Sequence, residues 1–127
     1  MKTTQEIFDK AKQLHQSGHI EEAQILYEKI IEKYKNNFQL FFLLGTSFLQ
    51  TKNYLKAINN LDNAIKLNPN YADSYNNKGI ALAEIKNYSD AIINYEKAIK
   101  INKHLFNAYI NKGVALKNLK RYEKAIE

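Results

Sequence analysis

The chain has 127 residues, of which 45% are hydrophobic and 25% charged, a composition that fits one folded domain and is too apolar for an intrinsically disordered segment. It contains no cysteine, which excludes disulfides, a thiolate nucleophile and cysteine-ligated metal sites. The formal net charge of +6 comes from lysines spread along the chain and a single arginine, Arg121, so nucleic-acid binding is only a weak alternative.

Equivalent residues recur every 34 positions along the chain. The glycines Gly45, Gly79 and Gly113 show this step most plainly. A period of this length is typical of proteins built from stacked supersecondary units. The same step relates four further sets of residues: Phe41, Tyr75 and Tyr109; Phe48, Leu82 and Leu116; Tyr54, Tyr88 and Tyr122; Ala57, Ala91 and Ala125. An earlier, more divergent copy fits the same register through Ile7, Ala11, Leu14, Ile20, Ala23 and Tyr27.

Each copy is predicted to form two helices joined by a short turn. Apolar residues recur at three- and four-residue steps, as amphipathic helices require, and the two-residue period of strands is absent. We expect repeats at 4–37, 38–71 and 72–105 and an incomplete fourth at 106–127, in a single array over 1–127. Glycine or asparagine tolerates the left-handed conformation that ends a helix. The predicted turns are Ser17-Gly18-His19, Lys52-Asn53, Lys86-Asn87 and Lys120-Arg121.

The repeated glycines fall inside predicted helices rather than in turns. Glycine in a helix costs about 1 kcal/mol relative to alanine, so a close approach between the paired helices is the expected compensation. The alanines Ala57, Ala91 and Ala125 are the expected small partners of these glycines.

These residues resemble the tetratricopeptide repeat family, in which an aromatic residue, a glycine and a leucine mark the first helix. Tyrosine and alanine then open the second helix, and Asn68-Pro69 matches the end of the unit. The resemblance implies an all-α, right-handed superhelical array of antiparallel helix pairs, here about three and a half repeats. It also implies a concave groove, lined by the first helices, that holds an extended peptide or a partner helix. The chain departs from the family where Lys10, Lys78 and Lys112 replace the leucine before the glycine.

The expected function is therefore a protein- or peptide-binding scaffold rather than an enzyme. Apolar side chains and amides at the groove positions favour binding over a merely solvated surface. Ten residues are the candidate groove residues: Phe8, Lys12, Phe42, Thr46, Asn76, Asn77, Ile80, Ile110, Asn111 and Val114.

Two of these residues, Asn77 and Asn111, occupy equivalent places 34 residues apart. They resemble the asparagines in the repeat arms of O-linked N-acetylglucosamine transferases and related bacterial proteins. A primary amide both donates and accepts hydrogen bonds, so such residues can hold peptide backbone whatever its side chains. An alternative function is thus the substrate-recruiting arm of a larger glycosyltransferase-like enzyme. The cationic set with which some family members grip the carboxylates of heat-shock chaperones is missing.

No residues suggest catalysis, a metal or a cofactor. His15 and His19 are four apart, but Ser17-Gly18 is expected to break the helix between them, and His104 lies far along the array. No apolar run is long enough for a signal peptide or a membrane span, so we expect a cytoplasmic protein.

The fourth copy stops about half a helix after Arg121, which suggests a fragment of a longer protein. An array that ends this way bares apolar surface on Tyr109, Leu116, Tyr122 and Ile126. Self-association through this end, as a structural module, is the remaining alternative function.

Overall fold

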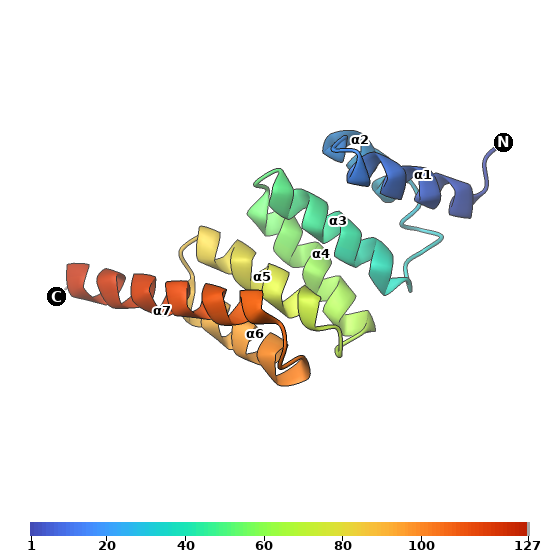
Figure 1. The fold of residues 1–127 in the computed structure, drawn as a ribbon. Helices are drawn as coiled ribbons and strands as arrows, with labels where there is room; N and C mark the ends of the chain where they lie inside the picture. The colour runs from blue at the N-terminus through green and yellow to red at the C-terminus, as the bar shows by residue number, and fades with distance from the viewer. Residues whose placement is uncertain (127) are drawn as a thin grey trace. The chain divides into compact units, whose positions relative to one another are not determined.

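The computed structural model describes residues 1–126, and within them it contains seven α-helices and no strand (Figure 1). The expected all-α helical-repeat class is confirmed. The helices are α1 (Thr4–Gln16), α2 (Ile20–Lys29), α3 (Phe38–Gln50), α4 (Tyr54–Leu67), α5 (Ala72–Glu84), α6 (Tyr88–Ile101) and α7 (Phe106–Ala125). The first, third, fifth and seventh are the first helices of the four copies.

The chain divides into two compact units, of which unit 1 comprises Met1–Asn68. Its four helices pack in sequence, α1 on α2, α2 on α3 and α3 on α4. A capping box begins α1: the Thr3 hydroxyl accepts from the Glu6 N–H at 3.1 Å, and the Glu6 carboxylate accepts from the Thr3 N–H at 3.5 Å. The core of this unit is built around Phe8, Tyr27, Leu40, Leu44 and Leu61.

Unit 2 starts at Pro69 and contains α5, α6 and α7. Here α6 packs against both α5 and α7, and α5 also contacts α7. Small side chains fill much of this core: Ala72, Ala98 and Ala108 form a cluster against which Tyr75 and Leu105 pack. Tyr95 on α6 is the largest side chain buried nearly completely in this unit, at 2% exposed.

The three turns within the helix pairs share one geometry. Gly18, Lys52 and Lys86 stand at the same repeat position and all have positive φ, at 89°, 64° and 67°. The following residue donates its N–H to a carbonyl five residues back, as Asn53 does to Phe48 at 2.8 Å and Asn87 to Leu82 at 2.9 Å. This is the Schellman ending of a helix. The expectation that asparagine takes the left-handed conformation is wrong, because the asparagines lie one residue later, at the start of the next helix.

The fourth predicted turn does not form. α7 continues without a break from Phe106 through Lys120 and Arg121 to Ala125. The described residues after Lys120 are too few to make a stable helix of their own, and continuing α7 keeps their backbone hydrogen bonds without the cost of a turn. The prediction of a helix pair ending in a second helix at Arg121 is therefore wrong for the described chain.

The glycines in the first helices do mark close approaches, but not to the alanines that we expected. A Cβ on Gly45 would lie 2.8 Å from Leu61 Cγ, and one on Gly79 would lie 2.5 Å from Tyr95 Cε1. These partners stand one helical turn after Ala57 and Ala91, which are themselves fully buried. At Gly113 a Cβ would meet nothing within 4 Å, since no second helix within residues 1–126 folds back over α7.

We predict that Gly79→Leu destabilises the protein by roughly 1 to 3 kcal/mol or more, because the new side chain collides with the buried ring of Tyr95. Gly113→Leu is the matched control. It places the same side chain in open space and removes a helical glycine, so it should be neutral or stabilising by up to about 1 kcal/mol. Urea denaturation followed by circular dichroism measures both changes. Equal stabilities of the two variants would contradict the helix packing described here.

Candidate functional site

In unit 1 a cleft lies between α1 and α3, and we call it the N-terminal cleft. Its volume is about 480 Å³. One residue of α2, Tyr27, also reaches it. The wall is mostly polar, formed by Lys12, His15, Gln16, Tyr27, Gln39, Leu43, Thr46 and Gln50.

A histidine bridge crosses the N-terminal cleft. His15 Nδ1 lies 3.0 Å from the Tyr27 hydroxyl, and His15 Nε2 lies 2.6 Å from Gln50 Oε1. Because Gln50 Oε1 can only accept, Nε2 donates to it, and in the neutral ring Nδ1 accepts from the tyrosine hydroxyl. Burial raises the pKa of Tyr27 to about 12, so its hydroxyl keeps its proton at neutral pH. The imidazole also lies edge-on to the Tyr27 ring, with ring centroids 5.8 Å apart.

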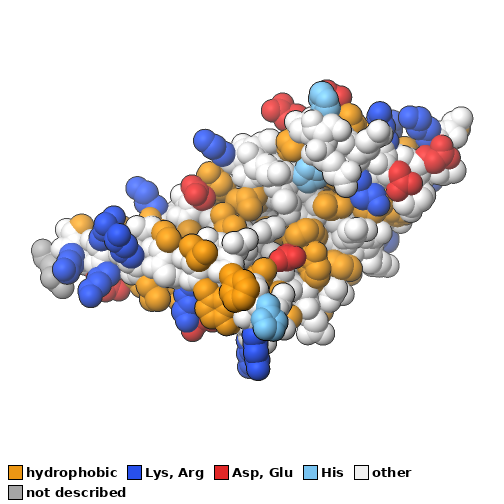
Figure 2. Space-filling model, in the orientation of Figure 1, with side chains coloured by type: hydrophobic (Ala, Val, Ile, Leu, Met, Phe, Trp, Pro, Cys, Tyr) orange, Lys and Arg blue, Asp and Glu red, His pale blue; other side chains and the backbone are white. Residues whose placement is uncertain are grey.

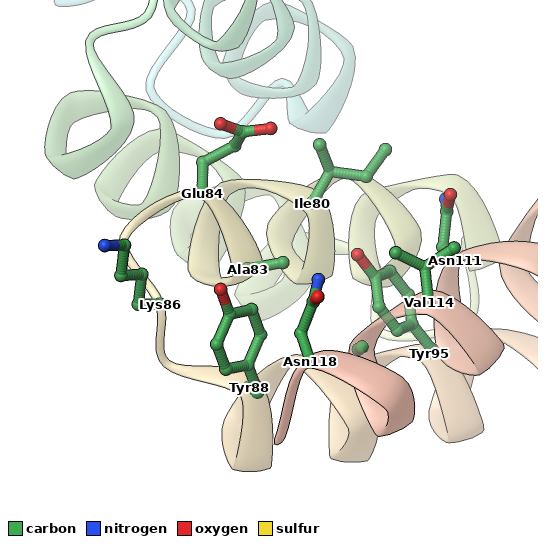
Figure 3. A pocket seen from close by; sticks show the side chains of 10 residues that line it. Ile80, Ala83, Glu84, Lys86, Tyr88, Tyr95, Asn111, Val114 and Asn118 are labelled. Atoms are coloured by element: carbon green, nitrogen blue, oxygen red, sulfur yellow. The ribbon is translucent and has the colours of Figure 1, made fainter. Parts of the chain in front are cut away.

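Unit 2 contains a second cleft, which we call the C-terminal cleft, of about 360 Å³ (Figure 3). It lies between α5 and α7, and α6 contributes the buried Tyr95. Both apolar and amide side chains line it: Ile80, Ala83, Glu84, Lys86, Tyr88, Tyr95, Asn111, Val114, Ala115 and Asn118.

The two clefts occupy the same repeat positions. Each lies between two successive first helices and has a tyrosine from the intervening second helix in its wall. Seven of the eight residues around the N-terminal cleft have a counterpart two periods later in the wall of the C-terminal cleft. The pairs are Lys12 and Ile80, His15 and Ala83, Gln16 and Glu84, Tyr27 and Tyr95, Leu43 and Asn111, Thr46 and Val114, and Gln50 and Asn118.

Five of the ten candidate groove residues line these clefts. Lys12 and Thr46 line the N-terminal cleft, and Ile80, Asn111 and Val114 line the C-terminal cleft. Three others lie outside both walls: Phe42 and Asn77 are half-buried, and Ile110 is 63% exposed.

The remaining two candidates are buried. Phe8 is only 2% exposed, packs edge-on against Tyr27 and Tyr34, and is covered by the Lys12 ammonium 4.5 Å from its ring centroid. The expectation of an exposed Phe8 is wrong, because its own repeat covers it. Asn76 is 7% exposed, and its Oδ1 accepts from Asn111 Nδ2 at 3.2 Å, so it orients a residue of the C-terminal cleft.

Sequence reasoning missed two buried tyrosines in the cleft walls. Tyr27 and Tyr95 are on second helices, whereas the family resemblance directs attention to the first helices. Their identical place in the first and third copies was a usable signal. Burial, and then the charge of Glu84, raises the pKa of Tyr95 to about 12, so this hydroxyl also stays protonated.

Residues 1–126 contain no group of three or more histidines and carboxylates placed to hold a metal ion. None of the seven helices is both long and apolar enough to cross a membrane.

Paired antiparallel helices that repeat every 34 residues, with clefts at equivalent positions, define the class of α-helical repeat proteins. Within this class the chain belongs to the tetratricopeptide repeat family. A family profile described as TPR repeat matches residues 45–86, and two described as Tetratricopeptide repeat match residues 72–105 and 94–127. No curated protein sequence matches the chain significantly.

Several solved structures share this fold at low sequence identity. A crystal structure of MamA is 24% identical and has a TM-score of 0.88, over 98% of this chain and 77% of that one. The first tetratricopeptide repeat domain of Spaghetti (RPAP3), bound to an HSP90 peptide, is 20% identical with a TM-score of 0.88, over 92% of this chain and 93% of that one. An O-GlcNAc transferase of Thermobaculum terrenum is 21% identical with a TM-score of 0.81, over 91% of this chain and 23% of that one.

Proposed function

We propose that this chain is a protein- or peptide-binding scaffold whose binding surfaces are the clefts between successive first helices. The observation that carries the proposal is the recurrence of the cleft at equivalent positions in both units. The repeated backbone places equivalent clefts at equivalent positions, and such recurring clefts are what a repeat protein offers to an extended ligand.

The chemistry of the C-terminal cleft suits a polypeptide. Val114 is 54% exposed and Ile80 is half-buried, so both can contact apolar side chains of a ligand. Asn111 uses Nδ2 to reach Asn76, which leaves its Oδ1 to accept an N–H from extended backbone. The proposal includes Asn77, one period earlier, as a second backbone contact. Solvent-accessible amides beside apolar side chains are a common composition for a peptide-binding surface.

Peptide binding by similar structures supports this proposal. The RPAP3 domains were solved with HSP90 and HSP70 peptides bound. The recruiting arm of a glycosyltransferase-like enzyme stays the alternative within the same class, supported by the similarity to the O-GlcNAc transferase.

Peptides selected from a random library against the full chain test the proposal. We predict that Val114→Glu weakens the binding of selected peptides by about tenfold or more, because a charge then replaces an apolar contact in the cleft wall. Ile93→Glu is the matched control, since Ile93 on α6 is 48% exposed and lies outside the cleft wall. Isothermal titration calorimetry measures both affinities. If Ile93→Glu reduces binding and Val114→Glu does not, the ligand binds elsewhere.

Self-association is a second candidate function, favoured by the exposed apolar face of α7. Tyr109 and Leu116 are 46% and 47% exposed. Leu82 on α5, the equivalent of Leu116, is only 7% exposed, because its second helix covers it. Burying a few hundred Å² of such surface yields on the order of 5 to 10 kcal/mol before association costs.

We predict a mass above that of a monomer in light scattering at up to about millimolar concentration, where weak association is detectable. Leu116→Glu should restore the monomer, because it places a charge on the exposed face of α7. Leu55→Glu, at a residue 72% exposed on α4, is the control and should leave the mass unchanged. A strictly monomeric wild type would rule out self-association.

A further inference from the structure

The C-terminal cleft keeps the outer two residues of the histidine bridge but has no histidine between them. Tyr95 and Asn118 stand where Tyr27 and Gln50 stand two periods earlier, so a hydroxyl and an amide are retained. Between them Ala83 replaces His15. Figure 3 shows Ala83 and Asn118 directed toward each other across this cleft, with the Tyr95 hydroxyl beside them.

The two retained polar groups have no hydrogen-bond partner among residues 1–126. The Tyr95 hydroxyl makes none of the hydrogen bonds found in residues 1–126 and is not among their buried unpaired atoms, so it is accessible, whereas the equivalent Tyr27 hydroxyl is bonded to His15. The Asn118 amide is likewise unpaired within these residues. Asn118 is half-buried, and both residues line the C-terminal cleft, so a polar group of a ligand can bond to them there.

We propose that the C-terminal cleft binds the imidazole of a histidine side chain on the partner polypeptide, in the place that His15 takes in the N-terminal cleft. The Tyr95 hydroxyl donates to one ring nitrogen, and the N–H of the other donates to Asn118 Oδ1. This assignment rests on the proposed function, that the cleft receives a polypeptide.

Three features select imidazole over other side chains. An apolar group would leave both Tyr95 and Asn118 unpaired. A carboxylate would meet opposite charges, Glu84 and Lys86, in the cleft wall and would gain no net attraction from them. A planar ring with an acceptor and a donor on different sides satisfies both groups, and the ring of His15 shows that such a group fits edge-on to the repeat-equivalent tyrosine. The walls add apolar contacts from Ile80 and Val114.

The probe for this site is the N-acetyl, N-methylamide derivative of histidine, titrated into the labelled full chain at about one pH unit above the ordinary imidazole pKa of ~6.5. Amide correlation spectra should show saturable shifts confined to the surroundings of Ala83, Tyr95 and Asn118. We predict weak binding, roughly millimolar, that is at least about tenfold tighter than for the alanine and glutamine derivatives. Tyr95→Phe should weaken histidine binding about tenfold, and Tyr122→Phe, at an exposed tyrosine of α7, should leave it unchanged.

Ala83→His provides the sharpest variant, because it restores the bridge within the chain and should abolish binding of the histidine derivative while raising the melting temperature. Asn118→Ala is the second variant if Ala83→His does not fold, and it should weaken binding about tenfold. Equal binding of the histidine and glutamine derivatives, or unchanged binding by these variants, overturns the imidazole assignment. Library-selected peptides that bind the cleft without containing histidine would overturn it too, while leaving the proposed function intact.

Discussion

The second and third repeats each depend on the close approach of the second helix to a glycine of the first helix. Leu61 lies over Gly45, and the ring of Tyr95 lies over Gly79 at a distance that admits no Cβ. The cost of a helical glycine is offset by this contact, which fixes where the second-helix side chain can lie. In unit 2 the consequence reaches the candidate site, since Tyr95 packs its ring on Gly79 and lines the C-terminal cleft. Tyr95 thus contributes both to the packing of the repeat and to the wall of the candidate site.

The repeat period was enough to predict the helix pairs, because a strict register leaves few positions for turns. The period predicted less well which residue of each turn would adopt the left-handed conformation. The left-handed position falls on Lys52 and Lys86, and their backbone hydrogen bonds, rather than side-chain preference, determine that conformation. The register also predicted a turn at Lys120 that the structure lacks. A turn forms only when the segment after it gains enough packing to offset its cost, and this requirement is invisible in the repeat pattern.

The candidate site was also predictable from the sequence only in part. Ile80, Asn111 and Val114 were predictable, because solvent-facing positions of a first helix follow from its periodicity. Phe8 was not, since its burial depends on Tyr34, which lies outside the repeated positions. The buried tyrosines Tyr27 and Tyr95 were also missed, because a buried aromatic residue on a second helix is indistinguishable in sequence from a core residue. Their role becomes visible only when the partners of their hydroxyls are compared between the two clefts.

That comparison shows how a repeat protein can diversify its surface while conserving its packing. The tyrosine is retained in both clefts, while the residues around it change from histidine to alanine and from leucine to asparagine. Such exchanges alter the hydrogen-bonding groups offered to a ligand without disturbing the helix pairs. Each cleft can then contribute its own specificity to a common mode of binding.

The central claim is that the clefts between first helices are the binding surfaces. A crystal structure of the full chain with a library-selected peptide tests it most directly. We expect the peptide to lie along α5 and α7, with its backbone bonded to Asn111 and a side chain against Val114. A peptide bound instead to the outer face of α6 at Ile93, with the C-terminal cleft empty, would contradict the account.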